Sequence, residues 1–239
     1  MGRARVDLNL RNDAPVPFDY QYYLASALYH KIQYSNFKLG TTIHNKAKYK
    51  QFTFSWLDIP RKEVLPHGIR ILDGYANFQI ASPNPEILKG FIEGLLSDPE
   101  LRLGNAKFEV QKVQTNVLER LGEIETFKCL SPILVRTIRE ADGRRIVWDL
   151  DPHETKFFTN LHANLVRKYA DYHGGGNPGR FDIQRLSNVK RTRIRIKDTY
   201  NRAYFMEFQV RGDPELMTFA YEAGLGERNS MGFGMLETV

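Results

Sequence analysis

The stretch from residue 20 to residue 57 contains no aspartate or glutamate, although the chain of 239 residues carries 28 of them. Its cations are two histidines and five lysines: His30, His44, Lys31, Lys38, Lys46, Lys48 and Lys50. Cations without neighbouring acids give a surface a positive potential, which attracts polyanions. The stretch therefore predicts a phosphate-binding surface, with Lys46 and Lys48 among its candidate contacts.

Residues 191–197 form a second basic segment, in which every second side chain is a cation. On a strand, these cations would share one face, while Ile194 and Ile196 would point into a core. Their mutual repulsion favours contact with an anion, and the candidate ligands of phosphate are Arg191, Arg193, Arg195 and Lys197. The alternative is an edge strand whose charges protect it from aggregation.

A glycine-rich segment, residues 224–234, lies between an expected helix ending near Ala223 and a last strand. Glycine permits left-handed backbone angles and close approach of a ligand, and successive exposed N–H groups can bind phosphate. The candidate contacts are Gly224, Gly226, Arg228, Asn229, Ser230, Gly232 and Gly234. A helix cap followed by a bulged turn would also need glycines. The segment matches neither a Walker A loop nor a dinucleotide-binding fingerprint.

The elements that must position these residues follow a β-α-β-β-α-β order in the first half. Alternation of polar and apolar residues predicts strands at 5–10, 52–56, 76–80 and near 108–110. Apolar residues between 20 and 32 recur at helical spacing, and a second helix has Asn84 as its cap and Pro85 as its first residue. This order is that of a ferredoxin-like domain.

The second half is predicted to have the same organisation. Strand signals surround residues 130–135, Asp142-Gly143 predicts a hairpin, and Asp151-Pro152 predicts the start of a long helix. Strands are expected at about 181–188, 191–197 and 203–211, followed by a helix from Asp213-Pro214. We therefore predict an α+β fold of two tandem ferredoxin-like (RRM-like) domains, each with an antiparallel sheet and two helices, over residues 1–120 and 121–239.

Composition excludes several other classes of protein. With 42% hydrophobic and 12% aromatic residues the chain can bury a core, so disorder is not expected. A single cysteine, Cys129, excludes an intrachain disulfide, and the histidines show no ligand spacing, so neither metal nor cofactor is expected. There is no signal-like N-terminus and no apolar run of 18 residues, so we expect a cytoplasmic protein without membrane contact.

The string from Tyr221 to Met235 closely resembles the C-terminal signature of the CRISPR repeat-RNA processing endoribonucleases of the RAMP superfamily. Segments similar to the same family occur in order at residues 17–24, 52–55, 80–83, 130–133 and 164–169, so the resemblance covers nearly the whole chain. It implies the two-ferredoxin fold and CRISPR repeat RNA (precursor crRNA) as the partner. Proteins of an interference complex and a second copy of the chain are further candidate partners.

The resemblance also implies a reaction. This family cuts each repeat without a metal: the 2′-hydroxyl attacks the scissile phosphate and leaves a 2′,3′-cyclic phosphate and a 5′-hydroxyl. In the archaeal members this reaction belongs to a tyrosine, a histidine and a lysine, which correspond here to Tyr29, His44 and Lys50. An imidazole can serve as acid or base, and an ammonium can stabilise the charge of the phosphorane.

Other interpretations stay open. A non-cleaving RNA-binding subunit of the same superfamily would share the fold and the glycine loop, and His44 is the feature that favours cleavage. A ferredoxin-like sheet that reads single-stranded RNA with paired aromatics is a third class, but no clear signature of such a module is present. Tyr29 could simply pack, His44 could be a solvated loop residue, and Lys46 and Lys48 are rivals of Lys50.

Overall fold

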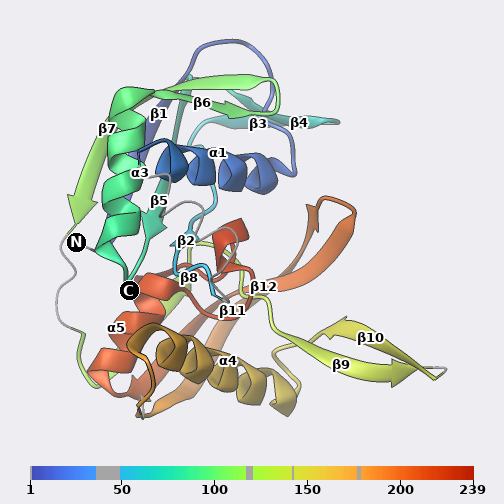
Figure 1. Cartoon of the computed structure of the whole chain (residues 1–239). Coiled ribbons are helices and arrows are strands. Elements are labelled where there is room, and N and C mark those ends of the chain that lie inside the picture. The colour runs from blue at the N-terminus through green and yellow to red at the C-terminus, as the bar shows by residue number, and fades with distance from the viewer. Residues whose placement is uncertain (1, 36–48, 117–120, 142, 177–178) are drawn as a thin grey trace. The chain divides into compact units, whose positions relative to one another are not determined.

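The computed structural model describes residues 2–35, 49–116, 121–141, 143–176 and 179–239 (Figure 1). The chain divides into two compact units. Unit 1 comprises Met1–Leu118 and Ser230–Gly232, and unit 2 comprises Glu119–Asn229 and Phe233–Val239. Within the described ranges, no helix is both long and apolar enough to span a membrane.

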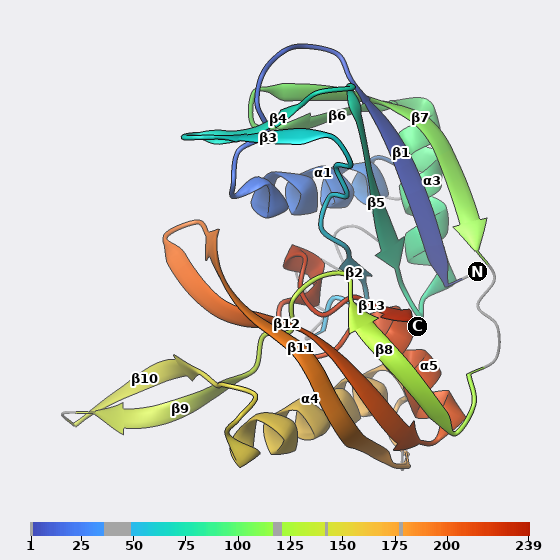
Figure 2. The same ribbon diagram turned by 180° about the vertical axis from the view of Figure 1, so that it is seen from behind.

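Unit 1 contains a five-stranded antiparallel sheet with the order β2-β5-β1-β7-β6. Its strands are β1 (Arg3–Leu10), β2 (Thr53–Phe54), β5 (Tyr75–Ala81), β6 (Glu100–Leu103) and β7 (Ala106–Asn116). The helices α1 (Tyr20–Ser35) and α3 (Pro85–Ser97) lie on the same face of this sheet (Figures 1 and 2). A separate hairpin, β3 (Lys62–Leu65) and β4 (Gly68–Ile71), is inserted between β2 and β5.

The core of unit 1 follows the predicted periodicities. Val6 and Leu8 on β1 are fully buried, and so are Leu24 and Leu28 on α1. The predicted start of the second helix is confirmed, since Pro85 is its first residue and the Asn84 side chain accepts a hydrogen bond from the Glu86 N–H at 3.1 Å.

Unit 2 contains a four-stranded antiparallel sheet with the order β11-β12-β8-β13. Its strands are β8 (Ile124–Cys129), β11 (Phe181–Ile196), β12 (Thr199–Gly212) and β13 (Leu236–Thr238). The helices α4 (Thr155–His173) and α5 (Pro214–Ala223) cover one face of it (Figures 1 and 2). A hairpin of β9 (Arg136–Ala141) and β10 (Arg144–Asp149) is inserted between β8 and α4.

The two units share one strand order. In each, the four strands of the β-α-β-β-α-β ladder lie in the order second, third, first, fourth: β2-β5-β1-β7 in unit 1 and β11-β12-β8-β13 in unit 2. The inserted hairpins and β6 are additions to this plan. The prediction of two ferredoxin-like domains, each with an antiparallel sheet and two helices, is therefore confirmed.

Several predicted boundaries were wrong. The strand expected around residues 130–135 is β8, which ends at Cys129, and Ile133 forms an isolated bridge with Tyr204. The strands expected at 181–188 and 191–197 form one strand, β11, because two irregularities, between Ile183 and Arg185 and between Ser187 and Lys190, absorb the break in alternation. The long helix begins at Thr155, because the preceding residues form a turn in which the Glu154 N–H donates to the Asp151 carbonyl oxygen at 2.9 Å. The hairpin predicted at residues 142–143 is present as β9 and β10, although Asp142 itself lies outside the described residues.

Candidate functional site

Tyr29 lies on α1 of unit 1, half-buried against the core. Its ring meets the ring of Phe52 edge-on, with 5.3 Å between centroids. Burial raises the pKa of Tyr29, and a side-chain hydrogen bond with Ser230, which belongs to unit 1, partly offsets this. The phenol therefore stays protonated at neutral pH and can donate a proton or a hydrogen bond. Tyr29 thus both packs and presents a hydroxyl group.

Lys50 lies two residues before the buried Phe52, the residue that contacts Tyr29. Between them, Gln51 has a φ of 54°, a left-handed conformation that is unfavourable for a residue with a Cβ. The Gln51 carbonyl oxygen accepts a hydrogen bond from the Ser82 hydroxyl at 2.6 Å, which holds this conformation. Burial lowers the pKa of Lys50. Tyr29 therefore contacts Phe52, and Lys50 precedes Phe52 by two residues in the chain.

His44, Lys46 and Lys48 lie outside the described residues. The described chain leaves the last turn of α1 at Ser35 and resumes at Tyr49. The histidine of the predicted catalytic group and two of the predicted phosphate contacts thus stay predictions.

The glycine-rich segment is folded tightly in the structure. Gly224, Gly226, Gly232 and Gly234 are all buried, and all have positive φ angles between 69° and 82°. A Cβ on Gly226 would lie 2.5 Å from the Leu134 carbonyl oxygen. The N–H groups of Leu225 and Glu227 donate to backbone carbonyl oxygens at 2.9 and 2.8 Å. These glycines are therefore explained by packing and by left-handed angles, and several of the N–H groups expected to meet phosphate have partners in the protein.

Lys168, which was not among the residues predicted from sequence, organises this segment from α4. Lys168 is 5% exposed, and its Nζ donates to the carbonyl oxygens of Gly224 and Gly226 and to Asn229 Oδ1. Burial lowers the pKa of Lys168 to about 7, and Glu227 opposes this. Lys168 shares the buried face of α4 with Leu161 and Leu165. Its helical spacing from these leucines is the feature of the sequence that could have predicted a buried lysine.

Arg228 is the cation of the glycine-rich segment. It is partly buried and has a φ of 57°, and the preceding Glu227 is held by Arg136 through contacts of 2.6 and 2.9 Å. Burial and the nearby Arg136 lower the pKa of Arg228, while Glu227 and Asp149 oppose this. A half-buried guanidinium beside another arginine is destabilised, so an anion would stabilise it.

The basic strand has the predicted alternation. Arg191, Arg193 and Arg195 are exposed on β11, while Ile194 and Ile196 are buried. The predicted strand position was wrong for Lys197, which lies beyond the end of β11 with a φ of 52°. Because β11 is an edge strand of its sheet, the edge-protection interpretation is compatible with these positions as well.

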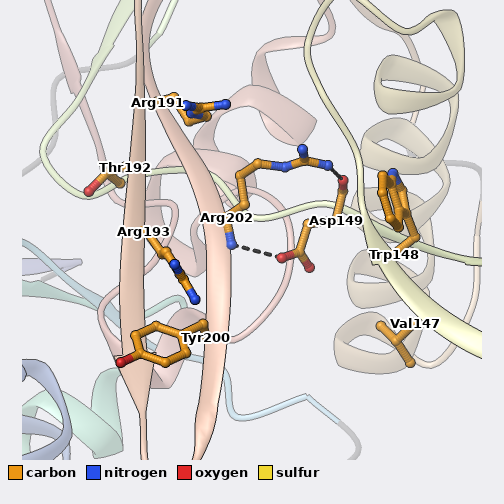
Figure 3. Close-up of a pocket in the computed structure, with 8 residues that line it drawn as sticks. All are labelled: Val147, Trp148, Asp149, Arg191, Thr192, Arg193, Tyr200 and Arg202. Carbon is orange, nitrogen blue, oxygen red and sulfur yellow. Dashed lines mark hydrogen bonds between the residues drawn. The ribbon is translucent and has the colours of Figure 1, made fainter.

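An open cleft of about 670 Å³ lies beside these arginines in unit 2 (Figure 3). Its charged and aromatic lining comes from β10, β11 and β12: Trp148, Asp149, Arg191, Arg193, Tyr200 and Arg202. The sequence did not predict that β10 and β12 line this cleft. Asp149 and Arg202 are 53 residues apart in the chain, and only the tertiary structure brings them into contact. Elsewhere in the described residues, no group of three or more His, Cys, Asp or Glu side chains could hold a metal ion.

Two ferredoxin-like units, with a glycine-rich segment before the last strand, are the arrangement expected from the resemblance to RAMP proteins. The family models described as "CRISPR-associated protein Cas6, N-terminal" and "CRISPR associated protein Cas6, C-terminal" match residues 15–114 and 114–238. The chain therefore belongs to the Cas6 family of CRISPR-associated proteins.

Individual relatives agree with this assignment. "CRISPR-associated endoribonuclease Cas6 1" of Methanocaldococcus jannaschii is 40% identical over 98% of this chain and 92% of its own length. A solved structure of a Cas6-related protein from Pyrococcus furiosus superposes with a TM-score of 0.93 at 31% identity, covering 100% of this chain and 98% of that one. A structure described as an RAMP protein binding different RNA substrates has a TM-score of 0.91 at 29% identity, with 100% of both chains covered.

Proposed function

We propose that the protein is an endoribonuclease that cuts CRISPR repeat RNA and retains the bound product. The observation that carries the proposal is its similarity, along nearly the whole chain, to a relative named as a CRISPR-associated endoribonuclease. The contact of Tyr29 with Phe52, which follows Lys50 by two residues in the chain, supports it, because RNA cleavage needs a proton donor and a cation near one phosphate.

In the proposed reaction, the 2′-hydroxyl preceding the scissile phosphate loses its proton and attacks the phosphorus. The bond to the 5′ oxygen breaks, the leaving oxygen takes up a proton, and the products carry a 2′,3′-cyclic phosphate and a 5′-hydroxyl. His44 and Tyr29 are assigned the two proton transfers, and Lys50 the stabilisation of the negative charge on the phosphorane. The partly desolvated ammonium of Lys50 interacts more strongly with an anion than a fully hydrated one.

The proposed reaction uses protein groups alone, so cleavage of a cognate repeat RNA is expected to persist in excess EDTA. The measurement is the single-turnover cleavage rate with and without chelator, combined with analysis of the product ends. Loss of activity that added magnesium restores would contradict the metal-independent reaction, and so would a 3′-hydroxyl on the upstream product.

Phosphate contact by the basic strand is the second part of the proposal. The variant Arg193→Ala/Arg195→Ala is expected to bind repeat RNA more weakly and with a smaller dependence on salt, by about 0.7 in log–log slope for each phosphate that the variant no longer neutralises. Arg70→Ala is the matched control, because Arg70 is exposed and paired with Glu63 at 2.7 Å in unit 1. An unchanged slope in the double variant would favour edge protection as the role of this strand.

A second candidate function is RNA binding without cleavage. It is favoured by the similarity to a structure described only as an RAMP protein binding different RNA substrates. The same cleavage assay distinguishes the two functions: stable binding of repeat RNA without product, with or without magnesium, would support the non-cleaving role.

A further inference from the structure

The cleft of unit 2 has two aromatic walls and a cationic floor (Figure 3). Tyr200 comes from β12 and Trp148 from β10, on opposite sides of Arg202 (Figure 3). The guanidinium of Arg193 lies 4.0 Å from the centroid of the Tyr200 ring, and those of Arg139 and Arg202 lie 4.6 and 5.3 Å from the centroid of the Trp148 ring. Stacked guanidinium groups extend the flat surface that each ring offers.

The charge of the cleft is unbalanced. Its lining in the described structure has three arginines, Arg191, Arg193 and Arg202, and a single carboxylate, Asp149. Asp149 is engaged with Arg202: its Oδ2 accepts from the Arg202 backbone N–H at 2.7 Å, and its carbonyl oxygen accepts from the Arg202 guanidinium. The positive charge of Arg191 and Arg193 is therefore available to an anionic ligand.

The wall formed by β10 is held in place before any ligand binds. The β9–β10 hairpin is tied to the rest of unit 2 by Asp149 and also by Arg139, whose guanidinium meets the Glu154 carboxylate at 2.6 Å. At its base, Asn160 Nδ2 donates to the Arg136 carbonyl oxygen at 2.9 Å. A wall fixed in this way lowers the entropic cost of ordering the site when a ligand binds.

The aromatic rings are accessible as well as close to the arginines. Tyr200 is 54% exposed and Trp148 is 37% exposed, which leaves ring surface open to a planar ligand. Phosphate alone would need the arginines and would leave these rings uncovered. Nucleobases stack on aromatic side chains and on guanidinium planes, and single-stranded RNA offers such faces because its bases can be unstacked.

We infer that this cleft binds one unpaired nucleotide of the RNA, with its base stacked against Tyr200 and Trp148 and its phosphates at Arg191 and Arg193. The inference rests on the proposed function for the identity of its ligand. It adds a nucleobase subsite in unit 2 to the phosphate contacts of β11. A cleft of about 670 Å³ lies within the range of roughly 300–1,000 Å³ typical of small-ligand sites.

The test is a scan of repeat RNA with abasic nucleotides. The probe carries a 2′-deoxy nucleotide at the cleavage position, so that binding is measured without turnover, and each other base is removed in turn. With the wild-type protein, removal at one or two positions is expected to weaken binding about tenfold to a hundredfold. In the variant Trp148→Ala/Tyr200→Ala, removing the same bases should not weaken RNA binding any further, because the rings on which they stack are already absent.

Two further variants separate stacking from folding. Trp148→Phe/Tyr200→Phe keeps flat rings and should retain the abasic pattern of the wild type. Phe18→Ala removes a 51% exposed ring in unit 1 and should also retain it. The inference is overturned if the alanine double variant shows the wild-type abasic pattern, or if it loses affinity equally for every probe.

Cleavage of unmodified repeat RNA, measured in parallel, keeps this inference separate from the proposed function. If the RNA is cleaved but no base contributes to binding through Trp148 and Tyr200, the nucleobase subsite is refuted and the endoribonuclease function stands. If one base contributes to binding through these rings but the RNA is not cleaved, the subsite stands and the endoribonuclease function is refuted.

Discussion

Replacing His44 with alanine is expected to lower the rate of repeat RNA cleavage by about 10²- to 10⁴-fold, the usual contribution of a positioned acid or base. Binding of repeat RNA should stay within a few-fold of wild type, because one imidazole adds little to an interaction dominated by lysines, arginines and phosphates. The measurements are the single-turnover cleavage rate with excess protein and the dissociation constant at the same salt concentration.

His67→Ala is the matched control, because His67 is exposed between β3 and β4 and has no proposed role. It should cleave like the wild type. Tyr29→Phe and Lys50→Ala should also slow cleavage, the first by removing the hydroxyl and the second by removing the cation. Full activity of His44→Ala would contradict the assignment of a proton transfer to His44.

Replacing Lys168 with methionine is expected to destabilise unit 2 by about 2–4 kcal/mol at about pH 8. Methionine fills the buried space, but it leaves the carbonyl oxygens of Gly224 and Gly226 and the Asn229 side chain without their donor. The measurement is the free energy of unfolding in urea. Hydrogen exchange should report the largest loss of protection in residues 224–229.

Lys156→Met on the same helix is the control, since Lys156 is exposed and its replacement should change stability by no more than about 0.5 kcal/mol. Equal stability of Lys168→Met and Lys156→Met would contradict a structural role of the buried Lys168 amino group.

The effect of Lys168 should also depend on pH. Burial lowers its pKa to about 7 in the folded protein, whereas a lysine in an unfolded chain has a pKa of about 10.4. Between these values the unfolded state binds more protons, so this lysine raises the free energy of unfolding as pH increases from about 7 to about 10. The gain is lost as pH falls through about 7.

The stability difference between wild type and Lys168→Met should therefore grow from about pH 7 to about pH 10. Urea unfolding of both proteins across this range, with Lys156→Met as reference, measures it. Parallel stability curves for all three proteins would contradict a lowered pKa of Lys168.

Much of the local structure was predictable because it depends on neighbours in the chain. The cap and proline at Asn84 and Pro85 start a helix through their own side-chain and backbone geometry, and the structure confirms this. The alternation from Arg191 to Ile196 places arginines and isoleucines on opposite faces for the same reason. Boundaries were less predictable, because the irregularities in β11 are set by its pairing with β12.

The sequence by itself determined the family and the two-unit ferredoxin-like plan, since periodicity and motif strings are local. Tertiary structure alone decided what the glycine-rich segment packs against, because the backbone acceptors of Lys168 lie 56 and 58 residues away from it. It also decided that Trp148 lines the same cleft as Arg191 and Arg193 of β11. Such contacts depend on strand order and register, which no local pattern of residues specifies.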